Sequence, residues 1–95
     1  MERMEHVFGK LLLDGEVLFE KVEGYICAHQ KKTGVAHFGH LILSDDQASK
    51  VCPTTSYRLL LDDRRAGNIY LDLHPGERPG TKIGEFHVTG KFEKK

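Results

Sequence analysis

YRLLLDDRRAGNIYLDLH, residues 57–74, is the stretch that decides the fold, because two runs of alternating apolar and polar residues flank a polar loop. Alternation at a period of two is typical of half-buried β-strands. With Asp63 to Gly67 as a five-residue loop, the inward-facing residues oppose one another across the hairpin, and these are Tyr57, Leu59, Leu61, Ile69, Leu71 and Leu73. The stretch therefore predicts an antiparallel hairpin with one apolar face.

The outer face of this hairpin supplies the first candidate site. In the same register Arg58 faces Asp72, and Leu60 lies opposite Tyr70. Apolar residues on a solvent-facing side indicate a second layer, a partner surface or a ligand floor. Arginines at the hairpin tip are suited to a phosphate or carboxylate, although neighbouring aspartates offset their charge. The candidate binding residues are Arg58, Leu60, Arg64, Arg65, Tyr70 and Asp72.

The same alternation recurs along the chain and predicts six strands, at about residues 6–13, 16–29, 35–43, 57–62, 68–74 and 83–92. Asp14-Gly15 is a dipeptide that type I′ hairpin turns prefer. In the second strand the apolar pattern changes face near Glu20-Lys21, which predicts a β-bulge there. Ser44 and Gln47 have the spacing of a capping box, so residues 45–50 are expected to form one helical turn.

These elements predict an all-β fold, a small six-stranded antiparallel barrel or meander with at most one short helical turn. Bulges and strand glycines favour closure, because they allow a sheet to bend. The apolar residues suffice to fill a small barrel without a disulfide or a metal. The predicted core comprises Phe8, Leu11 or Leu12, Val17, Phe19, Ile26, Leu41, Leu59, Leu61, Ile69, Leu71, Leu73, Phe86, Val88 and Phe92.

YICAHQKKTGVAHFGH, residues 25–40, raises the question of a metal site. With Thr33-Gly34 as a two-residue turn, Cys27 lies opposite His40, and His29 shares their face. The spacing matches neither paired Cys-x-x-Cys nor His-Glu-x-x-His, the patterns that make a zinc prediction specific. We therefore expect an ordinary hairpin and no metal, with Cys27, His29 and His40 as the alternative ligand set.

Length and charge narrow the class of protein further. Ninety-five residues predict one domain over 1–95, with short solvated termini. Lysine plus arginine and aspartate plus glutamate both number 14, so no net field favours nucleic acid or an anionic membrane. No apolar run approaches the ~20 residues of a membrane span. The absence of an apolar leader in MERMEHVFGK and the presence of only two cysteines, expected to be free thiols, indicate the cytoplasm.

No arrangement of residues indicates catalysis. The adjacent carboxylates Asp45-Asp46 and Asp62-Asp63 point apart on extended chain. The loop serines lack the context of a nucleophile elbow, and Cys27 has histidines nearby but no identified group to orient them. We therefore expect a non-enzymatic module without a cofactor that binds another protein or itself. An OB-like domain for single-stranded nucleic acid is the first alternative, because its element order is similar. A barrel that binds a small ligand or a metal is the second.

Overall fold

The computed structural model describes residues 4–94, so the expectation of solvated termini at residues 1–3 and 95 lies outside the described part. The elements are β1 (Met4–Leu13), β2 (Glu16–Lys31), β3 (Gly34–Ser44), α1 (Asp45–Ala48), β4 (Tyr57–Leu61), β5 (Arg65–Pro75) and β6 (Thr81–Lys94). The predicted all-β class, the six strands and the single helical turn are confirmed.

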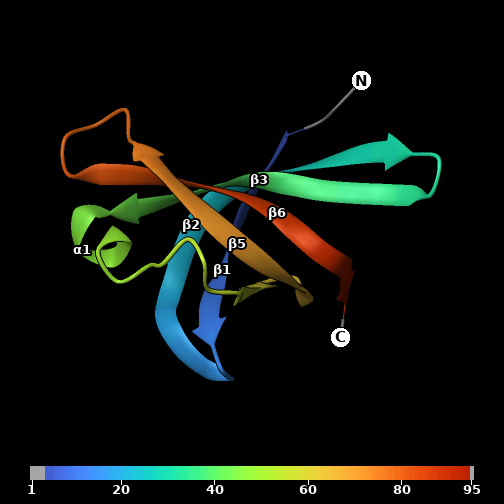
Figure 1. Ribbon diagram of the computed structural model, residues 1–95, viewed down its shortest axis with the longest axis horizontal. Helices are drawn as coiled ribbons and strands as arrows, with labels where there is room; N and C mark the ends of the chain where they lie inside the picture. The colour runs from blue at the N-terminus through green and yellow to red at the C-terminus, as the bar shows by residue number, and fades with distance from the viewer. Residues whose placement is uncertain (1–3, 95) are drawn as a thin grey trace.

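The six strands form a closed antiparallel barrel in the order β1-β2-β3-β6-β5-β4 (Figure 1). Two meanders, β1-β2-β3 and β4-β5-β6, are joined along two seams. At one seam β1 pairs with β4, and at the other β3 pairs with β6. The sequence left a barrel and a meander open, and the structure is a barrel.

The predicted turn and bulge both occur in the β1–β2 hairpin. Asp14 and Gly15 have φ angles of 53° and 83°, as a type I′ turn requires. Gly9 opposes Val22 whereas Leu11 opposes Phe19, which leaves one extra residue in β2 at Glu20-Lys21.

A second register shift follows directly, between the pairs Leu11–Phe19 and Leu12–Val17. This second shift exchanges the inward and outward positions in the part of β2 that precedes Phe19. Val17 is therefore 44% exposed and was wrongly predicted in the core, whereas Leu18 packs against the core.

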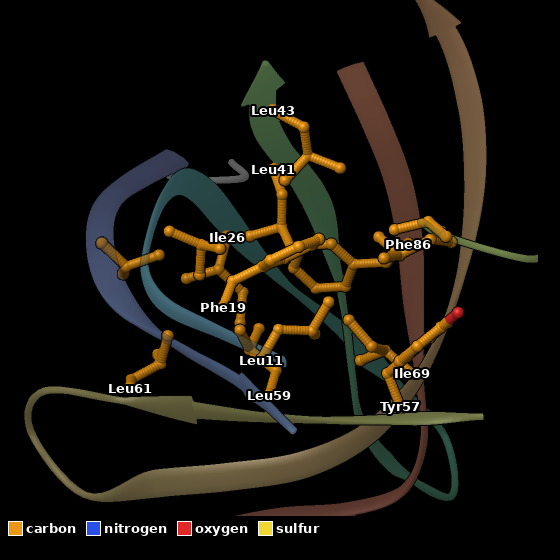
Figure 2. Packing of buried hydrophobic residues seen from close by; sticks show 14 of the residues in the cluster. Leu11, Phe19, Ile26, Leu41, Leu43, Tyr57, Leu59, Leu61, Ile69 and Phe86 are labelled. Carbon is orange, nitrogen blue, oxygen red and sulfur yellow. The ribbon is translucent and has the colours of Figure 1, made fainter. Parts of the chain in front are cut away.

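The core fills the barrel from both meanders, as Figure 2 shows. Phe86, Leu11, Leu41, Leu59, Ile69 and Leu71 are fully buried. Phe8 was wrongly predicted in the core: it is 42% exposed, because Val7 occupies the inward position of β1. Several buried residues were absent from the prediction, namely Val7, Val22, Cys27, Leu43, Ala48, Val51 and Ala66.

The short helix α1 fastens the β5–β6 connection to the barrel. Its capping box is formed as predicted: the backbone N–H of Gln47 donates to Ser44 Oγ at 3.1 Å, and that of Ser44 donates to Gln47 Oε1 at 3.0 Å. The N–H of Asp45 donates to the carbonyl of Gly80 at 2.9 Å, and Lys82 Nζ lies 3.6 Å from Asp45 Oδ1. The connection is thus held over one end of β3.

The β2–β3 hairpin extends beyond the barrel at the opposite end of β3 (Figure 1). Pairing of β1 with β2 reaches Cys27, and pairing of β6 with β3 begins at Phe38. Within the described residues, Ala28–Lys31 and Gly34–His37 therefore pair only with each other. We call residues 28–37 the arm.

Candidate functional site

The structure separates the residues that the sequence grouped on the β4–β5 hairpin. Arg58 opposes Asn68, to whose Oδ1 its Nη1 donates at 3.3 Å, and not Asp72. Leu60 opposes Ala66 and not Tyr70. The predicted contacts of this binding group were wrong by four residues of register, although each residue keeps its predicted face.

The error lies in the loop. The loop was predicted to have five residues, Asp63 to Gly67, but it has three, Asp62 to Arg64, and Arg64 adopts a positive φ of 76°. The N–H of Arg64 donates to the carbonyl of Leu61 at 2.9 Å, and that of Arg65 donates to Asp63 Oδ1 at 3.0 Å. These two bonds hold the shorter loop, and Gly67 lies in the strand opposite Leu59.

Arg65 is engaged at the end of the barrel. Its Nη2 lies 2.9 Å from Glu5 Oε2, its Nε lies 2.8 Å from Asp63 Oδ2, and its guanidinium carbon lies 5.7 Å from the centre of the Phe92 ring. The side chain is only 20% exposed. Two carboxylates neutralise it, so Arg65 has a structural role and does not join Arg64 in an anion site.

His37 lies beside Arg65 at this end, where a hollow of about 540 Å³ also borders Ile26 and Ala28. Its ring centre is 5.2 Å from that of Phe92. Burial, followed by the positive charge of Arg65, lowers the pKa of His37 below its usual 6.5. The neutral imidazole is the favoured form here.

The alternative metal ligands do not converge. The turn uses Lys32-Thr33, so Cys27 opposes Phe38 and His40 opposes Tyr25. Cys27 is 5% exposed. Among the described residues, no group of three or more His, Cys, Asp or Glu side chains is arranged to hold a metal ion. The predicted opposition of Cys27 and His40 was wrong, because the turn lies one residue earlier than expected.

Aromatic rings gather on part of the outer surface of the barrel instead. His6 of β1 stacks on Tyr25 of β2 at a centroid separation of 4.8 Å and lies equally close to Phe8. Tyr25 in turn contacts His40 of β3 at 5.2 Å. Each contact except His6–Phe8 crosses a strand boundary, so the rings follow the hydrogen-bonding direction of the sheet.

A second group of rings lies on β3, β6 and β5. Phe38 lies 6.2 Å from His87 of β6, and His87 opposes Tyr70 of β5. Tyr70 is 46% exposed. We call the outward side of these strands the ring face, and its rings are His6, Phe8, Tyr25, Phe38, His40, Tyr70 and His87.

Next to the ring face lies a cavity of about 450 Å³ beneath the β5–β6 connection. Ile42 and Ile83 oppose each other in the sheet and form its apolar part. Its polar residues, together with the rings that border it, are Glu23, Tyr25, His40, Glu77, Arg78 and Thr81. Thr81 closes the connection by donating from Oγ1 to the carbonyl of Arg78 at 2.7 Å.

Carboxylates accompany the rings. His6 Nε2 lies 2.7 Å from Glu23 Oε2, and His74 Nε2 lies 3.4 Å from both Asp72 Oδ2 and Glu85 Oε2. Asp72 therefore belongs to this face and opposes Glu85, away from Arg58. The surface combines exposed aromatic area with negative charge.

The sequence analysis did not identify the ring face, although the sequence contains a signal for it. His6 and Phe8, Phe38 and His40, and His87 are aromatic residues at alternating positions of three strands. Their adjacency depends on the seam between β3 and β6, which brings His87 beside Phe38. No local pattern specifies that seam.

Comparison of the chain with models of protein families, with curated proteins and with solved structures found no match. No helix among the described residues has the length and apolarity to cross a membrane.

Proposed function

We propose that the protein is a non-enzymatic binding module that holds another protein, or a second copy of itself, on the ring face. The observation that supports this is the gathering of aromatic rings from five strands on the outer surface of a barrel whose interior is already filled, with His6, Tyr25 and His40 in one group and Phe38, His87 and Tyr70 in a second. Tyrosine and phenylalanine are enriched at protein interfaces, because they bury large areas with few rotatable bonds.

Closure of the barrel supports a face rather than an edge as the binding element. The sequence allowed both an exposed strand edge and an outer face. In the barrel every strand pairs with two others. Within the described residues, the backbone that pairs on one side only is that of the arm and of shorter stretches of β1, β2, β5 and β6 beyond their paired ranges. Side chains of the ring face are therefore the principal contact groups that this proposal assigns to the barrel.

The test is capture by immobilised protein followed by quantitative mass spectrometry. Wild-type protein is compared with the variant Tyr25→Ser/Tyr70→Ser and with the control Arg58→Ser, which alters the outer side of β4. We expect a defined set of proteins to bind the wild type and the control but not the double variant. Each captured protein is then purified and its affinity measured by calorimetry. Equal capture by all three would contradict the proposal.

Binding of single-stranded nucleic acid is the second candidate, because exposed rings on a sheet can stack on bases. The carboxylates Glu23, Asp72 and Glu85 on the same face oppose it, since they repel phosphates. Fluorescence anisotropy of a labelled oligothymidine at low salt tests this function, and we expect no binding. Saturable binding that weakens with salt would favour nucleic acid over protein.

We also place the module in the cytoplasm as part of this proposal. Both cysteines are free, Cys27 buried and Cys52 exposed. An exposed free thiol suits a reducing compartment.

A further inference from the structure

Beyond His37, which packs on Phe92, the arm projects from the barrel. Its strands pair only with each other among the described residues, and most of its side chains are exposed. Lys31 and Lys32 stand at its tip, and neither forms a salt bridge within the part of the chain that the structure describes. A two-stranded ribbon of this kind is marginally stable in water unless it packs on something.

The ring face of the same molecule has the opposite charge. Glu23 and Glu77 border the cavity, and Asp72 and Glu85 lie on the adjacent strands. Arg78 is the one cation among the residues that line the cavity, apart from titratable His40. The chain thus carries a basic projection and an acidic, aromatic surface that are complementary.

The pleat of β2 relates the two. Glu23, Tyr25, Cys27, His29 and Lys31 occupy alternate positions of β2 and so share one side of the strand, which at Glu23 and Tyr25 is the outer side of the barrel. Glu23 and Lys31 are equidistant from Cys27, four residues on either side, which is about 13 Å along the strand. A two-fold axis that runs above the outer side of β2 at Cys27, perpendicular to the strand, therefore brings Lys31 of each molecule over Glu23 of the other.

We propose that two copies of the chain pack with the arm of each across the ring face of the other, with Lys31 and Lys32 meeting Glu23 and Glu77. This inference rests on the proposed function and names a second copy as the occupant. The contact is isologous, because each molecule gives an arm and receives one, and so it closes at a dimer. A lysine side chain entering beside Tyr25 also lies over an aromatic ring, which attracts cations.

Sedimentation velocity at low ionic strength, on untagged protein, tests this. We expect wild-type protein to sediment at twice its mass of 10.8 kDa and to dissociate as salt is raised. The variants Lys31→Glu/Lys32→Glu and Glu23→Lys/Glu77→Lys are each expected to self-associate at least about tenfold more weakly. An equimolar mixture of the two variants is expected to form a mixed dimer, because the reversed charges are complementary again.

The control Lys50→Glu/Arg64→Glu reverses two exposed charges that lie on neither the arm nor the strands of the ring face, and it is expected to remain a dimer. Thermal unfolding checks that each variant folds, and Glu77→Lys alone, in the β5–β6 connection, replaces the double variant if loss of the Glu23–His6 contact impairs folding. A monomeric wild type, dimeric charge-reversal variants, or a mixture that stays monomeric would each overturn the inference. None of these results affects capture of other proteins by Tyr25 and Tyr70. The capture experiment therefore tests the proposed function separately from the dimer.

Discussion

His37 shows how one side chain at the end of the barrel links charge to stability. Its ring packs against Phe92, and Arg65 lies close enough to disfavour a second positive charge. The unfolded chain has neither constraint, so its histidine takes up a proton at a higher pH than the folded protein does.

We therefore predict that His37 lowers stability in acid. Its folded pKa lies below the unfolded value of about 6.5, so the unfolded state binds more protons and stability falls as the pH drops through 6.5. The difference in Tm between wild type and His37→Gln, measured by calorimetry from about pH 7.5 to pH 5, is expected to shift in favour of the variant. A difference that is constant with pH would show that His37 titrates alike in both states.

The two cysteines differ in their access to solvent. Cys27 is buried, whereas Cys52 is exposed, and a hydrogen bond with the Thr54 hydroxyl at 3.1 Å lowers the pKa of Cys52. The thiolate is the reactive species, so the two thiols should react at different rates.

In native protein at neutral pH, we expect one thiol to react rapidly with an aromatic disulfide reagent and the second only after unfolding. Peptide mapping should place the first modification on Cys52. The variant Thr54→Val removes the hydroxyl and should slow that reaction, while Cys52→Ser should abolish the fast phase. Rapid modification of Cys27 would mean that β1 and β3 leave it accessible.

At the scale of single elements, hairpins were predictable in kind and less so in register. Asp14-Gly15 fixed the β1–β2 turn, because aspartate and glycine both tolerate positive φ. The β4–β5 loop was predicted to end at Gly67, yet it ends at Arg64, which has a positive φ, and the carboxylate of Asp63 accepts from the backbone N–H and the Nε of Arg65. Local hydrogen bonds of this kind outweigh the preference of a non-glycine residue for negative φ. The residue type alone does not show by how much.

Glycine in β3 gives a prediction for the joint between the arm and the barrel. A Cβ at Gly39 would overlap the carbonyl oxygen of Tyr25 and lie 3.0 Å from the Cα of Ile26. We expect Gly39→Val to lower the free energy of unfolding by about 2 kcal/mol or more, because the clash is with backbone. Denaturant unfolding measures it.

Gly15→Asn is the control for that substitution. Gly15 has a φ of 83°, a conformation that asparagine tolerates, and a Cβ at this position would have no atom within 4 Å. Its cost is expected to be below about 1 kcal/mol. Equal losses in both variants would show that β2 and β3 are less closely apposed at Gly39 than described.

At the scale of the whole molecule, composition and periodicity sufficed for the fold class. Six alternating runs, a bulge at Glu20-Lys21 and a capping box at Ser44 all agreed with a small barrel. The ring face could not be predicted from composition and periodicity, because it depends on which strand edges of the two meanders pair. Tyr70 was expected beside Leu60 and instead lies beside His87, a neighbour 17 positions further along the chain.

The core prediction has a direct test in Leu71, which is 1% exposed. Leu71→Asp places a charge in the apolar interior, and its cost, of several kcal/mol, approaches the total stability of a small domain. We expect the variant to lose cooperative thermal unfolding by circular dichroism. Tyr70→Asp, the adjacent outward residue, is expected to unfold cooperatively, and a Leu71→Asp variant as stable as wild type would contradict the strand assignment.

The two seams also dictate an order of events during synthesis. When β1, β2 and β3 have left the ribosome, the outer edges of β1 and β3 have no partners, since those partners are β4 and β6. The second meander has to be translated as far as His87 of β6 before both edges are covered. Closure of the barrel is thus a late step that joins distant parts of the chain. Before it, while only the first meander has been made, a chaperone would protect the exposed strand edges from aggregation.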